Sequence, residues 1–530
     1  MGWGSHFIEA ISSTPRTPVW ALESIRLLSG GVGGDRDYAS HAIGATYSPA
    51  IKIGAVRTGG SRLTPLSWTA TQGAFSVELF GDASDVLTYY SRGTVVRLML
   101  GFEGWDASEF APVALGMVKN LRGSTPRWSL ECWDLVQAMQ TRITSNTAQL
   151  ELFYGLGAQT RVSTSPPYTT SDNTLTVTST SGFQSETGGT GAVFVSPDSI
   201  GGDGFYLTYT GTSATQFTGV NTSDILGTTR LGLAAPTTED LVDEVAYING
   251  HPMDLVAKIL TSTGAGTNGA SDTLPTSWGY GLAEDLVDLF DLSTWKAALV
   301  ASSGDYEYAL IAHEPQSNGL GWLQSQLSGA GIVLVQRQGR LTCRPIQDPN
   351  GTDAEPFAPE LSLGFGPSHM EITDNEIMGV AYEAWDGQQA AEYANWKLSI
   401  VGSSSTYAAP ADETVQTLPV ADEYESFAPV DADGNAANIS LEISNRLKYW
   451  YYRIAERLTL TCAGLRLAQL CPGDIVEVTS SVLYGRSEAR STGGTGGAFA
   501  ARRAMVYGID PDWVAGRVVV TLAVLPDFGD

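Results

Sequence analysis

The chain has 530 residues, which is too long for a single hydrophobic core. At roughly 100–200 residues per domain it should hold about three or four domains. Its net charge is −27, from 57 acidic and 30 basic residues, and no run of Lys and Arg is present, so specific binding of nucleic acid is disfavoured. Charged residues make up only 16% of the chain while Gly occurs 59 times. This balance favours β-rich domains with many turns over helical bundles.

Residues 1–150 are predicted to form a β-domain. Apolar residues alternate in "GAFSVELFGD", and a second strand ends at Gly101-Phe102. The stretches "ALGMVKNL" and "RWSLECWDL" indicate a hairpin that turns at Arg122-Gly123-Ser124. A short helix is expected in "DLVQAMQTRI".

Residues 151–250 differ in composition, because Thr, Ser and Gly dominate them. Short strands at close spacing in "SDNTLTVTSTSGF", "GAVFVSP" and "GFYLTYTGTSATQFTGV" indicate a small β-barrel or sandwich. The strands before and after this segment could form their own sheets without it. We therefore interpret it as an inserted module, which we expect at the periphery of the molecule.

A helical section with a β-hairpin is predicted for residues 251–350. The spacing of apolar residues predicts helices in "HPMDLVAKILTSTG", "GLAEDLVDLFDL" and "GLGWLQSQLSGAG". The stretch "GIVLVQRQGRLTCRPI" then predicts a hairpin that turns near Gln338-Gly339.

Residues 351–530 are predicted to form a second β-domain. Strands are expected in "NEIMGVAYEAWDG", "NWKLSIVGS" and "RLTLTCAG", and a helix in "NISLEISNRLKYWYYRIAERL". The chain closes with "LCPGDIVEVTSS" and "AMVYGIDPDWVAGRVVVTL", two runs of β-branched residues with turns at Pro472-Gly473-Asp474 and Asp510-Pro511-Asp512. The fold class is therefore α+β, β-rich and multidomain.

The cysteines show none of the spacings of a metal site. Cys132, Cys343, Cys462 and Cys471 include no CxxC pair, so a structural zinc or iron–sulfur site is disfavoured. Cys132 and Cys462 fall inside apolar strands and are predicted to be small buried thiols. Such a low count is also typical of a reducing compartment.

The remaining polar residues form no catalytic constellation. The five histidines show no HxxxH or HExxH spacing, and His251, just before Pro252 at a helix start, is predicted to be a surface or capping residue. Four carboxylates lie close together without an apolar pocket that would raise a pKa, and they are interpreted as a solvated face rather than a glycosidase pair: Glu239, Asp240, Asp243 and Glu244. No catalytic, cofactor-binding or metal-binding residue is assigned, and no enzymatic activity is predicted.

The same stretches resemble tail hub proteins of long-tailed bacteriophages and related gene transfer agents. "LCPGDIVEVTSS" followed by "AMVYGIDPDWVAGRVVVTL" is similar to the closing strands of these hubs, and "GIVLVQRQGRLTCRPI" is similar to their hairpin after a helix. The strands from "GAFSVELFGD" to "WSLECWDL" resemble their tube-like domain, and "GFYLTYTGTSATQFTGV" resembles a small β-insertion of tail-tip proteins. Together these stretches span most of the chain.

The resemblance implies an architecture. Residues 1–150 and 351–530 would be two domains similar to the tail-tube subunit, with the inserted module and the helical section between them. A homotrimer would then present six tube-like units and adapt a sixfold tube to a threefold tip. Some hub-like proteins carry an iron–sulfur centre near the C-terminus, but only Cys462 and Cys471 lie there, so no cofactor is expected.

The resemblance also implies a role without enzymatic activity, as the structural hub of a tail tip or baseplate that forms part of the DNA ejection channel. Expected partners are the distal tail protein or tail tube, the tape-measure protein, and a tail fibre or central tip protein. Genomic DNA would pass in transit without being specifically bound. The protein would be part of the virion, assembled in the cytoplasm of the host bacterium. No export signal or membrane span is expected from the sequence.

Two alternatives stay open at this point. The 13 Trp and 21 Tyr could stack on sugars, as in a glycan-binding or carbohydrate-active β-protein, although Trp128, Trp133 and Tyr209 fall in strands that favour core positions. The acidity of the chain has two interpretations. Carboxylates could line the channel and repel the DNA, or they could only keep the surface soluble.

Overall fold

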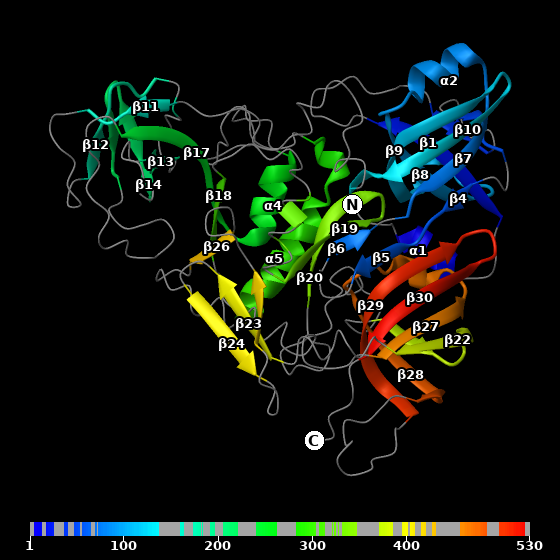
Figure 1. Cartoon of the computed structure of the whole chain (residues 1–530). Helices are drawn as coiled ribbons and strands as arrows, with labels where there is room; N and C mark the ends of the chain where they lie inside the picture. The colour runs from blue at the N-terminus through cyan, green and yellow to red at the C-terminus, as the bar shows by residue number, and fades with distance from the viewer. Residues whose placement is uncertain are drawn as a thin grey trace, which may run out of the picture.

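The computed structural model shows a strand-rich chain in which several mostly antiparallel sheets surround a short helical section (Figure 1). None of the helices in its described ranges is both long and apolar enough to cross a membrane. The structure describes residues 5–12, 17–25, 37–40, 47–52, 56–64, 69–71, 73–136, 159–163, 173–181, 183, 191–196, 205–220, 240–261, 282–303, 307–312, 321, 323–324, 327, 331–346, 370–384, 395–400, 403–408, 415–419, 427–430, 456–484 and 498–524.

The N-terminal β-domain is one sheet in the order β3-β2-β1-β8-β9-β10-β7-β4. Its face toward the core alternates as the sequence predicts, since Phe75, Val77 and Leu79 of β7 are all buried. The elements of this domain are α1 (Ser5–Ser12), β1 (Pro18–Ile25), β2 (Asp37–Ala39), β3 (Tyr47–Pro49), β4 (Arg57–Thr58), β7 (Phe75–Phe80), α2 (Ala83–Tyr89), β8 (Val95–Phe102), η1 (Ala107–Glu109), β9 (Ala111–Ser124) and β10 (Arg127–Asp134).

Most strand predictions for this domain are confirmed. Strand β8 ends at Phe102 as expected, and β9 and β10 form the expected hairpin. The hairpin turn is later than predicted, at Thr125-Pro126, because Ser124 still pairs with Arg127 in the ladder. Of the short helix expected in "DLVQAMQTRI", Leu135 and Val136 are helical and residues 137–143 lie outside the described residues.

The C-terminal β-domain is a sheet in the order β21-β28-β29-β30-β27-β22. The turn predicted at Asp510-Pro511-Asp512 is wrong, because these residues continue β29 and pair with β30. The turn follows at residues 513–516, where the side chain of Asp512 accepts the N–H of Ala515 at 2.9 Å. The elements are β21 (Met370–Thr373), β22 (Ile377–Ala384), β27 (Glu456–Ala463), η4 (Arg466–Gln469), β28 (Ile475–Tyr484), β29 (Ala498–Asp512) and β30 (Arg517–Val524).

The two β-domains are joined by strand pairing and by a shared core. After β4 the chain passes through Gly59-Gly60 into β5 (Ser61–Thr64), which pairs with β29 through Arg62 and Ser61 opposite Gly508 and Ile509. Beside β5, β6 (Thr69–Thr71) forms a second strand of the connection. Buried apolar residues from both sheets form one continuous cluster, which runs from Phe7 of α1 to Val524 of β30.

The inserted module has two small sheets and a hydrophobic core of its own. Phe183 and Phe217 meet edge to face at its centre, with ring centroids 5.0 Å apart. Its strands are β11 (Gln159–Arg161), β12 (Thr174–Thr176), β13 (Gly191–Ser196), β14 (Phe205–Tyr209), β15 (Gly211–Ser213), β16 (Gln216–Thr218) and the first half of β17 (Leu241–Gly250).

Strand β17 then leaves the module. Its second half pairs with β18 (Glu307–Ala312), which in turn pairs with β26 (Phe427–Val430). The strand predicted in "NWKLSIVGS" is β23 (Asn395–Ile400), which lies in a separate sheet with β24 (Ser403–Ala408) and β25 (Val415–Pro419). Of the helix predicted in "NISLEISNRLKYWYYRIAERL", residues 438–455 lie outside the described residues, and the last three residues belong to β27.

The helical section follows β17. Helix α4 (Pro252–Thr261) is confirmed, with its predicted apolar residues fully buried. The helix expected in "GLAEDLVDLFDL" is instead a short turn, η3 (Glu284–Leu286), followed by α5 (Leu289–Ser303), whose length was not predicted. The expected hairpin is confirmed as β19 (Ile332–Arg337) and β20 (Arg340–Pro345), turning at Gln338-Gly339. The described residues within "GLGWLQSQLSGAG" are helical up to Leu327.

We predict that Phe217→Ala unfolds the inserted module without unfolding the two β-domains, because the module has its own core. Phe217 is fully buried against Phe183 and Tyr209, and its truncation should cost about 3–5 kcal/mol. Calorimetry should show one transition moving to lower temperature while the others stay in place. Phe80→Ala, at a 37% exposed position of the N-terminal sheet, is the control. A single transition that shifts as a whole would contradict a self-contained module.

Candidate functional site

Charged side chains gather in the interior where the helical section meets the C-terminal β-domain. Five residues form this cluster, which we term the ionic junction: Asp291, Arg337, Thr342, Arg344 and Asp474. Buried charges are rare in proteins and demand partners, so a group of four in one place indicates a constrained site. Within the described ranges, the junction included, no group of three or more His, Cys, Asp or Glu residues is placed to hold a metal ion.

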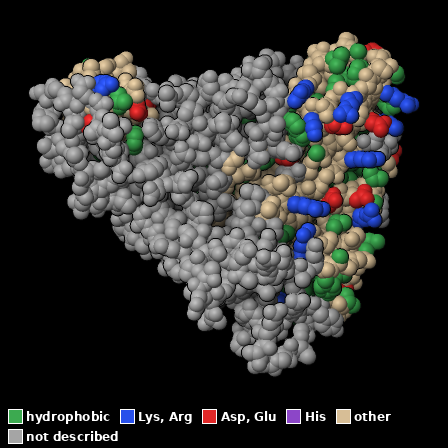
Figure 2. Space-filling view, viewed as in Figure 1, with side chains coloured by type: hydrophobic (Ala, Val, Ile, Leu, Met, Phe, Trp, Pro, Cys, Tyr) green, Lys and Arg blue, Asp and Glu red, His purple; other side chains and the backbone are tan. Residues whose placement is uncertain are grey.

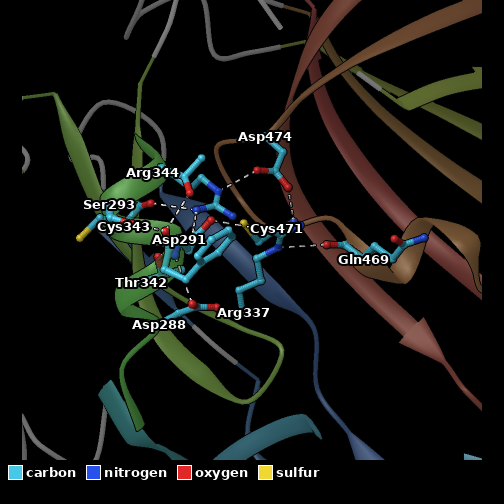
Figure 3. Close-up of polar contacts among 12 residues, drawn as sticks. Asp288, Asp291, Ser293, Arg337, Thr342, Cys343, Arg344, Gln469, Cys471 and Asp474 are labelled. Carbon is cyan, nitrogen blue, oxygen red and sulfur yellow. Dashed lines mark hydrogen bonds and ion pairs between the residues drawn. The ribbon is translucent and has the colours of Figure 1, made fainter. Parts of the chain in front are cut away.

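Arg344 lies at the centre of the ionic junction, between two carboxylates (Figure 3). Its Nη1 donates to Oδ2 of Asp291, and its Nε donates to Oδ1 of Asp474 at 2.8 Å. The Arg344 guanidinium also lies 5.2 Å from the ring centroid of Trp295. The side chains of Arg344, Asp291 and Asp474 are at most 1% exposed. This arrangement pairs the cation on two sides and stacks it on a third.

Asp291 has further partners on the hairpin. Arg337 places its Nη1 3.7 Å from Oδ1 of Asp291, and Thr342 donates its hydroxyl to Oδ2. The Nε of Arg337 also donates to the carbonyl of Gln469 in η4, at 3.3 Å. Two arginines therefore face two aspartates, so the junction has no net charge and both sides of the interface contribute to it.

Local sequence explains why Asp291 lies there. Asp288 precedes α5, and its Oδ1 accepts the backbone N–H of Asp291 at 3.2 Å, which caps the helix. The N–H of Asp288 donates to the carbonyl of Leu341 at 2.8 Å, which ties this helix end to β20. Asp291 is thus in the first turn of α5, where the helix dipole favours a carboxylate.

A tight turn places Asp474. The chain turns through Cys471-Pro472-Gly473-Asp474, and Oδ2 of Asp474 accepts the N–H of Cys471 at 2.8 Å. Gly473 has φ 98°, and a Cβ atom there would lie only 2.9 Å from Cβ of Arg344. The Pro-Gly-Asp turn signal within the predicted C-terminal domain therefore provides both the close approach to Arg344 and its anionic partner.

The other end of the same hairpin contacts the N-terminal β-domain. Gly339, with φ 67°, lies so close to Pro112 that a Cβ atom would come within 2.7 Å of Cβ of Pro112. Arg97 of β8 donates to the carbonyl of Asp285 at 2.9 Å and to its carboxylate at 3.3 Å. The hairpin and η3 thus touch both β-domains, with buried charges toward one and a partly exposed ion pair toward the other.

Two thiols flank the ionic junction. Burial raises the pKa of Cys343 and of Cys471, and the nearby positive charge of Arg344 opposes this only in part. Burial likewise raises the pKa of Cys132, and it raises that of Cys462 to about 12. All four cysteines are free and buried, which confirms the prediction for Cys132 and Cys462.

Other sequence predictions fare differently. His251 is a capping residue, as one of its two predicted roles requires, because its Nδ1 accepts the N–H of Met253 at 3.2 Å. It is 6% exposed, so the surface placement is wrong. The solvated face predicted at residues 239–244 is also wrong for Asp240 and Glu244, which are buried because the first half of β17 lies between β11 and β13. Asp243 accepts a hydrogen bond from Gln159, and Glu239 lies outside the described residues.

Two of the three aromatic residues named as possible sugar platforms lie in hydrophobic cores. Tyr209 is 2% exposed within the inserted module, and Trp128 is 8% exposed, with its indole N–H donating to the carbonyl of Gly81 at 3.0 Å. Trp133 is half-buried, with the ammonium group of Lys119 5.1 Å from its ring centroid. These placements confirm the core prediction for Trp128 and Tyr209.

The ionic junction itself was not predicted. Besides the turn at Pro472-Gly473-Asp474, its signal in the sequence is the presence of Arg337 in "IVLVQR" and of Arg344 in "RLTCRP", two strands otherwise suited to burial on both faces. A charged residue within such a run must find a buried partner, but the run does not say where that partner lies.

Comparison with known proteins finds distant likenesses among solved structures. No family model matches the chain, and no curated protein matches it. Among solved structures, the chain is similar to a component described as the virion of a native gene transfer agent particle, at 12% identity and a TM-score of 0.20, over 46% of this chain and 84% of that one. It is also similar to the prophage MuSo2 43 kDa tail protein from Shewanella oneidensis, at 10% identity and a TM-score of 0.33, over 96% and 98% of the two chains.

One of these neighbours is thus a prophage tail protein, and the other is part of a gene transfer agent particle. With TM-scores this low, the function of the chain has to be inferred from its own residues.

We predict that Arg344→Met destabilises the protein by about 3–5 kcal/mol, because it leaves Asp291 and Asp474 as buried charges without their main partner. Arg517→Met is the matched control, since Arg517 and Asp512 form an ion pair at 52% and 41% exposure, and its loss should cost less than about 1 kcal/mol. Urea unfolding measures both. Equal effects of the two substitutions would contradict a structural role for the junction.

We also predict that the four thiols do not react in the native protein. Because burial raises the pKa of each, the reactive thiolate is scarce at pH 8 and the sulfur atoms are covered. A thiol-specific chromogenic disulfide should label no cysteine of the native chain and all four after denaturation. Rapid labelling of native Cys343 or Cys471 would show that the junction opens.

Proposed function

We propose that this protein is a structural hub of a phage-type tail tip, which adapts the tail tube to the central tip. The observation that carries the proposal is the union of two β-domains, from opposite ends of the chain, through the β5–β29 pairing and one continuous core. A chain that presents two such domains side by side doubles the number of units in a ring, so three copies supply six. The family resemblance of the closing strands and the hairpin supports the same role.

The ionic junction supports a mechanical rather than a chemical function. Its charges are neutralised within the protein, and its strongest contacts join α5, the hairpin and the turn before β28. A hub has to keep its domains in register while other tail proteins attach and detach. Buried ion pairs resist displacement because separating them leaves charges in a medium that cannot solvate them.

The inserted module suits a contact role at the periphery. In Figure 1 it lies at the opposite side of the molecule from the two β-domains, joined to the helical section by β17. We propose that it contacts a tail fibre or a neighbouring tip protein. The two β-domains would then contact the tail tube. Their partners would be a distal tail protein or the tube itself, and the tape-measure protein.

The charge of a DNA channel stays a prediction. On the face drawn in Figure 2, Lys and Arg side chains are interspersed with Asp and Glu over both β-domains. An acidic channel wall would therefore have to be formed by a different face. Genomic DNA is proposed to cross the ring in transit only, since a wall without a continuous row of cations offers few phosphate contacts.

The proposal predicts where the protein lies and how many copies are present. Tail particles from a producing culture, labelled with antibody against this chain, should carry label at the distal end of the tail in electron micrographs. Quantitative mass spectrometry of the same particles should give three copies per tail, because the ring is expected to be a homotrimer. Label along the tube, or six copies per particle, would contradict the proposal.

A further inference from the structure

The outward face of the N-terminal sheet is rich in cations. The buried residues of β7 alternate with Ser76, Glu78 and Phe80, which therefore point away from the core. Directly opposed residues of antiparallel strands share a face, so the register of β4, β9 and β10 shows which of their residues point outward. Five cationic side chains lie on this side of the sheet, which we term the cationic face: Lys52, Arg57, Lys119, Arg122 and Arg127.

Few carboxylates balance these cations. Among the described residues of β4, β7, β9 and β10, two carboxylates point outward, Glu78 and Glu131, so five cations and two anions leave a charge of +3. In the part of the chain that the structure describes, no carboxylate lies within ion-pair distance of Arg57, Arg122 or Arg127. The charges of these three arginines are therefore open to a partner.

The cationic face is also open to solvent. The side chains of Lys52 and Glu78 form an ion pair at 2.7 Å, and each is 47% exposed. The three arginines of the face are exposed as well. Phe80, at 37% exposure, adds an apolar ring whose centroid lies 5.8 Å from the guanidinium carbon of Arg127. The face is thus uncovered within a single copy of the chain.

The negative charge of the chain is concentrated in residues 348–433, which we term the acidic segment. This segment holds 17 Asp and Glu residues and one Lys, so it carries −16 of the net −27. Residues 1–150 hold 12 acidic and 12 basic residues and are neutral as a whole. Of the acidic residues between these two ranges, Asp240, Asp288 and Asp291 are buried. The acidic segment therefore carries the largest excess of negative charge.

We propose that the cationic face binds the acidic segment of a second copy of this chain, a contact that rests on the proposed function because it joins neighbouring copies of the ring. Within one copy, strands β23, β24 and β25 of the acidic segment lie on the other side of the helical section from the N-terminal sheet (Figure 1). Two chains that each carry −27 repel one another, so copies associate best where a cationic surface meets a carboxylate-rich one. A contact between two unlike surfaces is heterologous, and its repetition from copy to copy closes a ring.

The cationic face fits a protein segment better than a nucleic acid. Glu78 and Glu131 lie among the cations, and they would repel a backbone that carries a phosphate at every nucleotide. A protein segment with spaced carboxylates can meet the arginines and avoid these two positions. The exposed ring of Phe80 beside Arg127 also suits a protein partner, because aromatic residues and Arg are enriched in protein interfaces.

The first test is Arg122→Glu in the full-length chain. This reversal should weaken self-association at least fivefold, because it places a carboxylate against the acidic segment. Arg517→Glu is the matched control, since it makes the same change of charge at a 52% exposed position of the C-terminal sheet, and it should associate within about twofold of wild type. Sedimentation velocity over a concentration series measures the association, and circular dichroism checks the fold. Should Arg122→Glu not fold, Arg57→Glu takes its place.

Salt gives a second measurement on the wild-type chain. The ion pairs of the contact lie at a surface and are screened by salt, whose screening length is about 8 Å at 0.15 M and about 3 Å at 1 M. Raising the salt concentration from 0.05 M to 0.5 M should therefore weaken self-association at least tenfold. Association that is unchanged or strengthened by salt would show an apolar contact instead and would contradict the proposal.

A third test identifies the partner surface. Unlabelled and nitrogen-15-labelled copies are mixed and treated with a zero-length carbodiimide, which joins a Lys amine to a carboxylate in contact with it. Mass spectrometry should find links of mixed isotope composition between Lys52 or Lys119 of one copy and a carboxylate of residues 348–433 of the other. Mixed links that join these lysines only to other parts of the chain would overturn the assignment of the acidic segment.

The outcomes separate this contact from the proposed function. A wild-type chain that stays monomeric up to about 1 mM overturns the contact, as does equal association of Arg122→Glu and Arg517→Glu. Binding of a short double-stranded DNA that Arg122→Glu abolishes, with self-association unchanged, would assign the face to nucleic acid instead. If antibody still finds the protein at the tail tip in those cases, the hub survives and another surface closes its ring. If the protein is absent from tails, the hub proposal fails, whatever the association shows.

Discussion

The guanidinium of Arg344 is the constraint on which the rest of the structure depends. At 1% exposure it has lost its water, and removing an ion from water costs several kcal/mol unless partners replace the solvent. Those partners come from two separate parts of the chain, Asp291 at the start of α5 and Asp474 in the turn before β28. Neither part satisfies the cation alone. The helical section and the C-terminal sheet therefore fit together in one arrangement, which the ion pairs specify and the surrounding apolar residues hold.

The N-terminal β-domain is held by contacts of a different kind. It shares apolar surface and a pair of strands with the C-terminal sheet, while the hairpin tip at Gly339 lies against Pro112. Hydrophobic burial is not directional, so it fixes how much surface is covered more than which residue meets which. The hydrogen-bonded ion pairs of the ionic junction are directional, so they specify which residues of the helical section and the C-terminal domain meet. The hairpin β19–β20 therefore contacts both the N-terminal and the C-terminal sheet, and these two sheets also contact each other directly.

Local patterns in the sequence predict the strands of this protein better than the way its parts meet. Strands β7 and β8 and the hairpin β19–β20 follow from alternation and turn signals, because each depends on residues a few positions apart. The junction depends on Asp291 and Arg344, which lie 53 positions apart, and on Asp474, 130 positions beyond Arg344. Nothing local marks them as partners. An aspartate in the first turn of a helix has an ordinary explanation as a favourable charge at the helix end.

Two further predictions from local composition were wrong. Asp510-Pro511-Asp512 has the composition of a turn, yet Pro511 pairs with Val518 within the ladder because the next residues, 513–516, make the turn instead. The carboxylates before and within β17 have the composition of a solvated face, yet β11 and β13 cover Asp240 and Glu244. In the first case the turn lies only a few residues further along the same hairpin, whereas in the second case strands distant in sequence override the local preference.

Strand β17 would transmit a mechanical load from the inserted module to the helical section. It is one continuous backbone that belongs to two sheets, pairing with β13 at one end and with β18 at the other. A pull on the inserted module along this strand would load the ladder from Ala246–Ala312 to Gly250–Tyr308 in shear, with its hydrogen bonds sharing the load rather than breaking one after another. The strand leads directly into α4, which packs beside α5. Tension applied at the periphery would thus arrive at the helix that carries Asp291.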